Sequence, residues 1–247
     1  MFSKCLEGKV VLITGASGLI GSELAIELAK EKANLILHYN KSEDVIEDLI
    51  SKLSPVTQVH AIKCDFSDLN NVVEFLKYLK NTYRRIDIVV NSVGIYDETP
   101  LELLNVELLT KILNINLLSI VLISKELGML MKEYGGTIIN LICLTPLRGH
   151  KVYKCLNPSL PYVISKTGLI QLVKYLAVEL APKVKVVGIA LGWVGSSKLT
   201  QDLVRCVEGS VPMKRVAEAH EVVELIKYLI CGSQYITGSI IEFSGGL

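Results

Sequence analysis

The sequence shows no large charge imbalance of either sign. Lys and Arg number 26 and Asp and Glu number 25, which gives a net charge of +1. This balance argues against nucleic acid or an anionic membrane surface as a general partner. Hydrophobic residues make up 50% of the chain and charged residues 21%, so a large core is expected and disorder is not. We therefore expect a small-molecule partner, no nucleic acid and no membrane.

Paired cysteines are also missing. The six cysteines are scattered, with no CxxC pair and no histidine at zinc-site spacing. They are Cys5, Cys64, Cys143, Cys155, Cys206 and Cys231. This pattern predicts neither a metal site nor a disulfide framework, and it favours free thiols in a reducing cytoplasm.

No segment has the composition of a membrane span or a signal peptide. The longest strongly apolar stretch, residues 112–124, contains Asn114 and Asn116, so it is expected to be too short and too polar to cross a bilayer. Residues 1–15 are interrupted by charged side chains and lack a signal peptide's apolar run. We expect a soluble protein of the cytoplasm.

Short runs rich in β-branched residues alternate with helical patterns along the whole chain. Apolar residues recur at three- and four-residue steps in 18–31, 42–53 and 69–83, which predicts helices. The expected strands are residues 9–14, 34–39, 58–63, 86–91, 137–142, 185–190 and 239–243. Continuous apolar strands separated by helices predict a parallel sheet of about seven strands with helices on both faces. We expect residues 1–247 to form a single α/β domain of the doubly wound Rossmann type, with its ligand beyond the carboxyl ends of the strands.

A glycine-rich turn, TGASGLIG, follows the first expected strand. Glycines spaced three apart let the backbone turn tightly and approach a pyrophosphate at a helix N-terminus, although a purely structural turn could carry them as well. The position between the first strand and the first helix favours nucleotide binding. The turn residues expected to bind the nucleotide are Gly15, Ser17, Gly18, Leu19, Ile20 and Gly21.

The ends of the second and third strands bear on the choice of nucleotide. Tyr39, Asn40 and Lys41 offer no carboxylate for a ribose 2′-hydroxyl, and Lys41 could accept a 2′-phosphate. NADP is therefore preferred, with NAD as the alternative; Lys41 could also be a solvated charge before a helix. Asp65 after the third strand either caps the next segment or accepts a hydrogen bond from the adenine amino group.

Tyr162 and Lys166 lie four residues apart in LPYVISKTGL. If this segment is helical, the two side chains share one face, with Cβ atoms about 5–6 Å apart. A lysine ammonium at that distance should lower the phenol pKa from its usual value of about 10. Tyr162 would then be an acid or base usable near neutral pH.

The ordered set of motifs resembles the short-chain dehydrogenase/reductase family over nearly the whole chain. The segments that carry the resemblance are TGASGLIG (14–21), Asp65, NSVG (91–94), Asn116 in LNINLLS, YVISK (162–166), ALGWV (190–194) and ITGSIIEFSGG (236–246). The resemblance implies an NAD(P)-dependent oxidoreductase acting on a carbonyl or alcohol, usually as a homodimer or homotetramer. It also implies that Tyr162 donates a proton to the substrate oxygen, that Lys166 holds the nicotinamide ribose, and that Asn116 positions a water in the proton relay.

Further site residues follow from the same resemblance. It implies that residues 192–215 form a mobile lid over the substrate and that the Thr237–Gly238 motif contributes to subunit contacts. The additional residues expected to bind the cofactor are Phe66, Asn91, Gly94, Gly192 and Val194, and those expected to contact the substrate are Thr145, Tyr162 and Trp193.

The chain departs from the family pattern at two important positions. Leu19 occupies the middle glycine seat of the turn, a spacing more typical of extended members, while the length and the C-terminal motif look classical. Cys143 falls on the serine that hydrogen-bonds the reacting oxygen, and a thiol is a weak donor. Loss of one such donor can cost on the order of 10²–10³ in rate. Thr145 could substitute if the extended backbone continues, because residues i and i+2 of a strand point the same way.

Two functions are compatible with this pattern. The first is an NADPH-dependent carbonyl reductase similar to 3-oxoacyl-carrier-protein reductases or pteridine reductases, with Tyr162, Lys166, Asn116 and Cys143 as catalytic residues. The second is a nucleotide-binding protein with weakened catalysis that acts as a redox sensor or scaffold, and Cys143 motivates it. The sequence does not identify the substrate.

Overall fold

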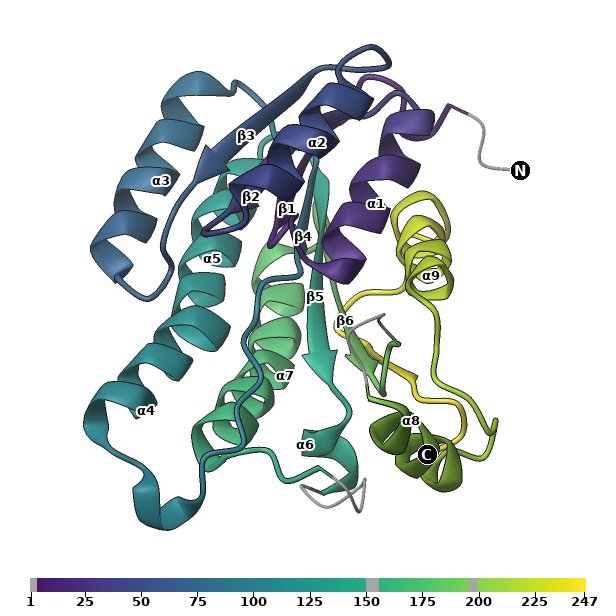
Figure 1. Cartoon of the computed structure of the whole chain (residues 1–247). Coiled ribbons are helices and arrows are strands. Elements are labelled where there is room, and N and C mark those ends of the chain that lie inside the picture. The colour runs from purple at the N-terminus through teal and green to yellow at the C-terminus, as the bar shows by residue number, and fades with distance from the viewer. Residues whose placement is uncertain (1–3, 150–155, 196–199) are drawn as a thin grey trace.

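Seven parallel strands form a single sheet, as the sequence predicts (Figure 1). The computed structural model describes residues 4–149, 156–195 and 200–247. The strands are β1 (Val10–Thr14), β2 (Asn34–Tyr39), β3 (Val59–Lys63), β4 (Ile88–Asn91), β5 (Gly136–Cys143), β6 (Val184–Leu191) and β7 (Ile240–Phe243). Their order in the sheet is β3-β2-β1-β4-β5-β6-β7, so the direction of winding reverses between β1 and β4. All seven expected strands are confirmed, and no end moves by more than two residues.

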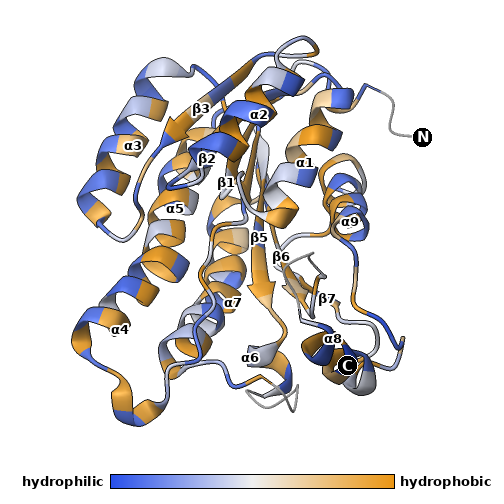
Figure 2. Ribbon diagram, in the orientation of Figure 1, coloured by the Kyte–Doolittle hydropathy of each residue, from blue (hydrophilic) through white to orange (hydrophobic). Residues whose placement is uncertain are grey.

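Helices cover both faces of the sheet, also as predicted. The helical elements are α1 (Leu19–Lys30), α2 (Glu43–Leu53), α3 (Leu69–Thr82), η1 (Leu101–Leu103), α4 (Val106–Leu113), η2 (Asn114–Leu118), α5 (Ser119–Met131), α6 (Thr145–Arg148), α7 (Leu160–Leu180), α8 (Gln201–Ser210) and α9 (Ala219–Cys231). Apolar side chains of α1, α2 and α9 pack on one face, and those of α3, α5 and α7 pack on the other. Figure 2 shows the corresponding pattern, with hydrophobic strands between helices that have one polar side.

Two of the helices near the site begin where a local side chain satisfies one of their first backbone N–H groups. The Asp68 carboxylate accepts from the N–H of Asn70 at the start of α3. The Asn105 side chain accepts from the N–H of Leu108 at the start of α4. Such caps stabilise a helix by about 1 kcal/mol each, and the cap of α3 explains why the polar start of that segment predicted where the helix begins.

The run from α4 through η2 to α5 is longer than the sequence suggested. It spans Val106–Met131, 26 residues, and by length and composition alone it could cross a membrane. The expectation that residues 112–124 are too short is therefore wrong for the helix that contains them, because the helix extends beyond the apolar stretch in both directions. Inner side chains such as Ile123 and Leu127 belong to the core against the sheet, while Val106 and Met129 are exposed.

A disulfide joins Cys5 to Cys231, which contradicts the expectation of free thiols only. Their Cα atoms lie 5.8 Å apart although the residues are 226 apart in sequence, so no spacing rule could reveal the pair. The bond ties the segment before β1 to the end of α9. Among the described residues the free thiols are Cys64 and Cys143, and Cys155 lies outside them. The argument from thiols for a cytoplasmic protein is thereby removed, and that localisation stays a prediction.

Candidate active site

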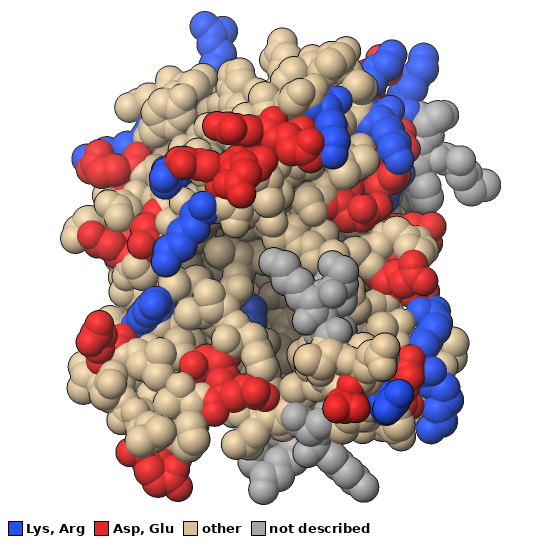
Figure 3. Space-filling model, in the orientation of Figure 1, with Lys and Arg blue, Asp and Glu red and all other residues tan. Residues whose placement is uncertain are grey.

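A cavity of about 1020 Å³ lies at the carboxyl ends of β1, β4, β5 and β6. This is where the winding of the sheet reverses and where ligands of such sheets bind. Figure 3 shows this face hollowed near its middle, with mainly uncharged residues around the hollow. The predicted site residues that line the cavity are Gly18, Leu19, Ile20, Gly94, Cys143, Thr145, Tyr162, Lys166, Gly192, Trp193 and Val194. Its volume is at the upper end of those typical of ligand pockets, so it can hold more than a small substrate alone.

The glycine turn after β1 needs its glycines for close packing. Gly15 has φ +68°, a left-handed conformation, and a Cβ there would lie 2.9 Å from the Cα of Val93. A Cβ at Gly21 would overlap the carbonyl oxygen of Gly15. Gly18 occupies the N-cap of α1 and has no side chain to cap the helix. The N-terminus of α1 is therefore open to an anionic group of a ligand.

Tyr162 and Lys166 lie in the first turns of α7, so the helix that the sequence analysis required is present. The side chains share one face, and the Nζ of Lys166 lies 5.9 Å from the centre of the Tyr162 ring. Both residues are buried, with exposed fractions of 9% and 7%. A Cβ at Gly94 would lie 3.1 Å from the Lys166 Nζ, so the glycine leaves room for the ammonium.

The pKa of Tyr162 moves in the direction opposite to the expected one. Burial raises it well above the usual value for a phenol, and the neighbouring Cys143 and Tyr96 act in the same direction. Burial also lowers the pKa of Lys166, which weakens the lysine as a source of positive potential. The sequence could not anticipate this because desolvation is a tertiary property. A neutral phenol at this position can donate a proton.

Cys143 and Thr145 form a pair at the end of β5. The Sγ of Cys143 lies 3.1 Å from the Oγ1 of Thr145, and the Thr145 N–H points to the same sulfur at 3.4 Å. The extended backbone, on which the alternative role of Thr145 was conditional, does not continue, because β5 ends at Cys143 and α6 begins at Thr145. The turn nevertheless brings the hydroxyl beside the thiol, and both residues line the cavity.

Asn116 is fully buried in η2 and its side chain is committed to one partner. Its Oδ1 accepts from the Ile95 N–H at 2.8 Å, and its Nδ2 donates to the Ile95 carbonyl at 2.9 Å. The side chain thus fixes the segment that follows β4. The expected role of Asn116 in positioning a water stays a prediction.

The sequence analysis missed an aromatic wall. The Tyr96 ring lies edge-on to Tyr162, with centroids 5.1 Å apart, and edge-on to Trp193 at 6.3 Å. The Tyr96 hydroxyl donates to the Glu98 carboxylate at 2.7 Å. The sequence could have indicated Tyr96 through its position two residues after Gly94, beyond the carboxyl end of β4. Other missed residues that line the cavity are Ser92, Ile95, Leu141, Ile142, Leu156, Pro158 and Leu191.

The ends of β2 and β3 hold the residues expected to select the nucleotide. The Asp65 carboxylate accepts from the Ser67 N–H at 2.9 Å, and this bond is the main cause that lowers the Asp65 pKa. Asp65 therefore caps the segment that follows β3, which is one of the two roles expected for it. Lys41 is exposed and close enough to Asp65 to lower that pKa further. Phe66 is buried, so its side chain does not face a cofactor and only its backbone is available.

Three further predicted segments have structural anchors. Asn91 is buried, and its Nδ2 donates to the Ser124 hydroxyl and the Asn140 side chain, which links β4 to α5 and β5. The backbone N–H of Gly192 donates to Phe243 in β7. The backbone N–H groups of Val186 and Gly238 join β6 to the 237–238 motif through the Thr237 hydroxyl and the Val186 carbonyl. The expected lid, residues 192–215, is described except for residues 196–199.

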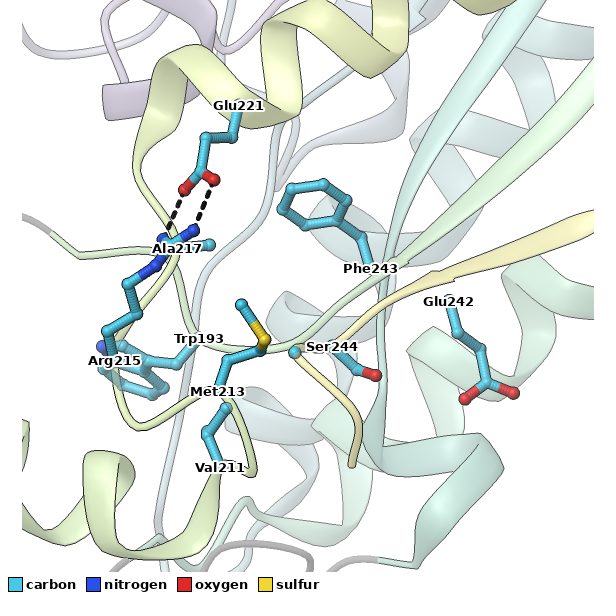
Figure 4. Close-up of a pocket in the computed structure, with 10 residues that line it drawn as sticks. Trp193, Val211, Met213, Arg215, Ala217, Glu221, Glu242, Phe243 and Ser244 are labelled. Carbon is cyan, nitrogen blue, oxygen red and sulfur yellow. Dashed lines mark hydrogen bonds and ion pairs between the residues drawn. The ribbon is translucent and has the colours of Figure 1, made fainter.

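A second cavity of about 250 Å³ lies beside the first, and Trp193 lines both (Figure 4). Val211, Met213 and Phe243 give it apolar walls. In Figure 4 the Arg215 guanidinium pairs with the Glu221 carboxylate through two contacts of 2.7 Å. The arginine lowers the pKa of Glu221 to about 2, so this carboxylate is ionised at neutral pH.

Residues 15–247 match the family model described as enoyl-(acyl carrier protein) reductase, a short-chain dehydrogenase/reductase model. The chain belongs to the short-chain dehydrogenase/reductase family. It is 28% identical to the 3-oxoacyl-[acyl-carrier-protein] reductase FabG of Staphylococcus epidermidis over 97% of this chain and 98% of that protein. The FabG of Thermotoga maritima is also 28% identical, over 98% of each chain. The protein is thus an NAD(P)-dependent short-chain dehydrogenase/reductase. The family resemblance and the Rossmann-type fold expected from the sequence are confirmed.

Solved structures of the family agree in fold. The short-chain dehydrogenase/reductase of Serratia marcescens superposes with a TM-score of 0.87 at 26% identity, over 98% of both chains. A short-chain dehydrogenase of Burkholderia cenocepacia in complex with NADP superposes with a TM-score of 0.85 at 23% identity, again over 98% of both chains. The Rossmann-type α/β architecture is therefore shared with these two structures over nearly their full length.

The residues present fit a dinucleotide of the family. The glycine turn is folded tightly enough that a Cβ at Gly15 or Gly21 would overlap backbone atoms, and this brings its backbone to the edge of the cavity. The open N-terminus of α1 suits a pyrophosphate, and the cavity continues from there to Tyr162 and Lys166. One ligand could therefore reach from the helix N-terminus to the buried phenol and ammonium.

Proposed function

We propose that this enzyme is an NADPH-dependent carbonyl reductase in which Tyr162 donates a proton to the substrate oxygen. The convergence of Tyr162, Lys166 and the glycine turn on one cavity carries the proposal. Burial keeps the Tyr162 phenol neutral, which is the form required of a proton donor in the reducing direction. The nicotinamide cofactor supplies the hydride when bound.

The chain's own residues have distinct roles in this proposal. Gly15, Gly18 and the N-terminus of α1 hold the pyrophosphate, and Lys166 holds the nicotinamide ribose. Asn116 holds the segment that follows β4 in place through its two hydrogen bonds to the backbone of Ile95. The preference for NADPH over NADH rests on Lys41 and on the lack of a carboxylate among residues 39–41.

A 3-oxoacyl thioester is the proposed type of substrate. The relatives named 3-oxoacyl-[acyl-carrier-protein] reductase, each 28% identical over almost the whole chain, support this choice. The wall of Tyr96 and Trp193 would then flank the reacting carbonyl. A pterin is the alternative substrate, and the same assay tests it.

The test follows NADPH consumption with 3-oxoacyl thioesters, pterins, quinones and sugar ketones. We expect turnover with the 3-oxoacyl thioester and its loss in Tyr162→Phe. Absence of turnover with every substrate, together with unchanged behaviour of Tyr162→Phe, would overturn the proposal.

A second candidate is a nucleotide-binding protein with weakened catalysis that acts as a redox sensor or scaffold. The free thiol of Cys143 at the position of the family's serine favours it. Cofactor binding without turnover, and no gain in Cys143→Ser, would select this candidate over the reductase.

We also propose that the enzyme is a homodimer or homotetramer. Exposed apolar residues on neighbouring helices support this proposal, with Leu118 at the end of η2 and Ile164, Tyr175 and Val178 on α7. Light scattering on the purified protein would test it, and Val178→Glu should lower the assembled fraction. A monomer at all concentrations would contradict it.

A further inference from the structure

His38 is a buried polar residue within an apolar strand. It follows Leu35, Ile36 and Leu37 in β2 and is only 1% exposed. Because β2 lies between β1 and β3, the carboxyl end of β2 separates the glycine turn from the Asp65 segment. A histidine buried at such a point must find partners for both ring nitrogens or lose the free energy of their hydration.

Both ring nitrogens have backbone partners. The Gly15 N–H donates to Nδ1 at 3.1 Å, and Nε2 lies 3.0 Å from the Cys64 carbonyl oxygen. A backbone N–H can only donate and a carbonyl can only accept, so Nδ1 must be unprotonated and Nε2 must carry the hydrogen. The two contacts are satisfied together only by the neutral Nε2–H tautomer.

The backbone of His38 holds the next residue of the turn. Its carbonyl oxygen accepts from the Ala16 N–H at 2.9 Å. Two successive N–H groups of the glycine turn therefore end on one residue of the neighbouring strand. Gly15 needs this support because its left-handed backbone is packed against Val93 and has no side chain to anchor it.

The imidazole also joins the turn to the other side of the nucleotide region. Its ring stacks on Phe66, with centroids 3.8 Å apart and an angle of 8° between the planes, and it meets Phe75 of α3 edge-on at 5.5 Å. One side chain thus connects the end of β1, the end of β3 and α3. Movement of the ring would disturb the glycine turn and the Asp65–Phe66 segment together.

We propose that His38 is a positioning residue for cofactor binding, whose neutral imidazole fixes the glycine turn in the shape that receives the pyrophosphate. This rests on the proposed binding of NADPH at that turn. Protonation of Nδ1 would place a donor against the Gly15 N–H and remove the only acceptor that the ring offers to the turn. The enzyme should then lose cofactor affinity in acid before it loses its fold.

Burial, opposed by the neighbouring groups, determines the pH at which His38 takes up a proton. Among the described residues, the Cys64 carbonyl and the Asp65 carboxylate at the end of β3 act on the imidazole, and the uncharged Phe75 of α3 meets it edge-on. Burial lowers the His38 pKa to about 4, against the opposing effects of the Cys64 carbonyl and Asp65. Burial raises the pKa of the Cys64 thiol to about 11, so the thiol stays neutral.

The test compares two substitutions at His38 by calorimetric titration with NADPH. His38→Leu removes the acceptor, and we expect its Kd to rise roughly tenfold to hundredfold, because a buried N–H is left without a partner. His38→Asn supplies an amide oxygen that cannot titrate, and its Kd at neutral pH should stay within about threefold of the wild type. His38→Leu should raise the KM for NADPH by a larger factor than it lowers kcat, because the lost acceptor lies at the cofactor end of the cavity.

The pH profile separates positioning from simple packing. The wild-type Kd should rise as the pH falls toward about 4, and His38→Asn should lack this rise. His60→Asn is the matched control, since His60 is exposed and hydrogen-bonded to the Tyr83 hydroxyl; its profile should match the wild type. An unchanged Kd in His38→Leu, or the same acid profile in His38→Asn, would overturn the proposal.

A readout that needs no cofactor distinguishes this proposal from the proposed function. Hydrogen exchange of the Gly15 and Ala16 amides in the apoenzyme should be faster in His38→Leu than in the wild type or His38→Asn. Equal exchange in all three proteins would count against the role of His38. A wild type that binds no NADPH, while the amides respond as expected, would instead refute the proposed function. Should His38→Leu fail to fold, His38→Asn and the wild-type pH series still decide the question.

Discussion

The nucleotide end and the substrate end of the cleft are built in different ways. At the ends of β1, β2 and β3, backbone groups meet fixed partners, with His38 linked to Gly15, Ala16 and Cys64. At the ends of β5 and β6, side chains face a cavity of about 1020 Å³. Binding at the nucleotide end therefore depends on the shape of the backbone. Chemistry at the substrate end depends on which side chains project into the cavity.

The difference explains where this chain departs from its family. A glycine turn tolerates few changes because a Cβ at Gly15 would strike Val93. The seat at the end of β5 requires only a donor of suitable strength, so a thiol at Cys143 with a hydroxyl at Thr145 can occupy it. At the glycine turn the departure is the spacing, with Leu19 in the middle glycine seat, whereas at the end of β5 it is the donor group itself.

Tyr162→Phe should give the largest difference between an effect at the substrate end and an effect at the nucleotide end. Removal of the phenol hydroxyl should lower kcat by about 10²–10⁴, because the proton donor is lost. The Kd for NADPH should change little, because the glycine turn is untouched. Steady-state kinetics and calorimetric titration measure the two quantities. Tyr175→Phe, at an exposed position of the same helix, is the control and should alter neither; a large loss of NADPH binding in Tyr162→Phe would contradict the division.

Acid should weaken the nucleotide end through His38. Its pKa is about 4 in the folded protein, below the ordinary value of 6.5. As the pH falls below 6.5 the unfolded chain takes up a proton that the folded chain refuses, so the free energy of unfolding decreases until about pH 4. The total loss from this residue is about 3 kcal/mol.

Denaturant unfolding across this pH range would measure that loss. Acidic side chains with lowered pKa values, such as Asp65 and Glu221, also lose stability in acid, so the informative quantity is the difference between wild type and His38→Asn. Between pH 6.5 and about 4, the free energy of unfolding of the wild type should fall further than that of His38→Asn, by up to about 3 kcal/mol. Parallel curves would show that His38 does not titrate as described.

The sheet could be predicted from the sequence because its information is local. Residues 10–13 and 186–191 have no polar or charged side chain, which is typical of strands buried on both faces. The Tyr162–Lys166 pair was found for the same reason, since helical spacing alone puts both on one face. Where three or four neighbouring residues determine the answer, the pattern predicted it.

Features that depend on distant residues could not be predicted. Cys5 and Cys231 meet only when α9 packs near the N-terminal segment. His38 has the same place in its strand as an apolar core residue, and its partners Gly15 and Cys64 are revealed only by the order of the strands. The raised pKa of Tyr162 likewise follows from burial, which the spacing of residues does not report.

Changes at the end of β5 should alter rate with little effect on cofactor binding. Cys143→Ser should raise kcat about tenfold or more, because a hydroxyl is a stronger donor to the reacting oxygen than a thiol. Thr145→Val should lower kcat by about tenfold to hundredfold if its hydroxyl supplies the working hydrogen bond. Both effects should appear in single-turnover measurements at saturating NADPH. A loss in Cys143→Ser equal to that in Thr145→Val would show that the thiol itself is required.

Lys41→Ala should produce the smallest effect, and it tests whether the nucleotide end reads charge as well as shape. Lys41 is exposed, so its interaction with a 2′-phosphate is screened by water and salt, and we expect about a tenfold loss of NADPH affinity with no change for NADH. Lys63→Ala is the matched control, because that ammonium is paired with the Glu43 carboxylate at 2.7 Å. The loss in Lys41→Ala should shrink as salt is added, since the interaction is electrostatic. Equal losses for NADPH and NADH would mean that Lys41 only shapes the end of β2, and selection between the two nucleotides would then have to come from the backbone around Asn40.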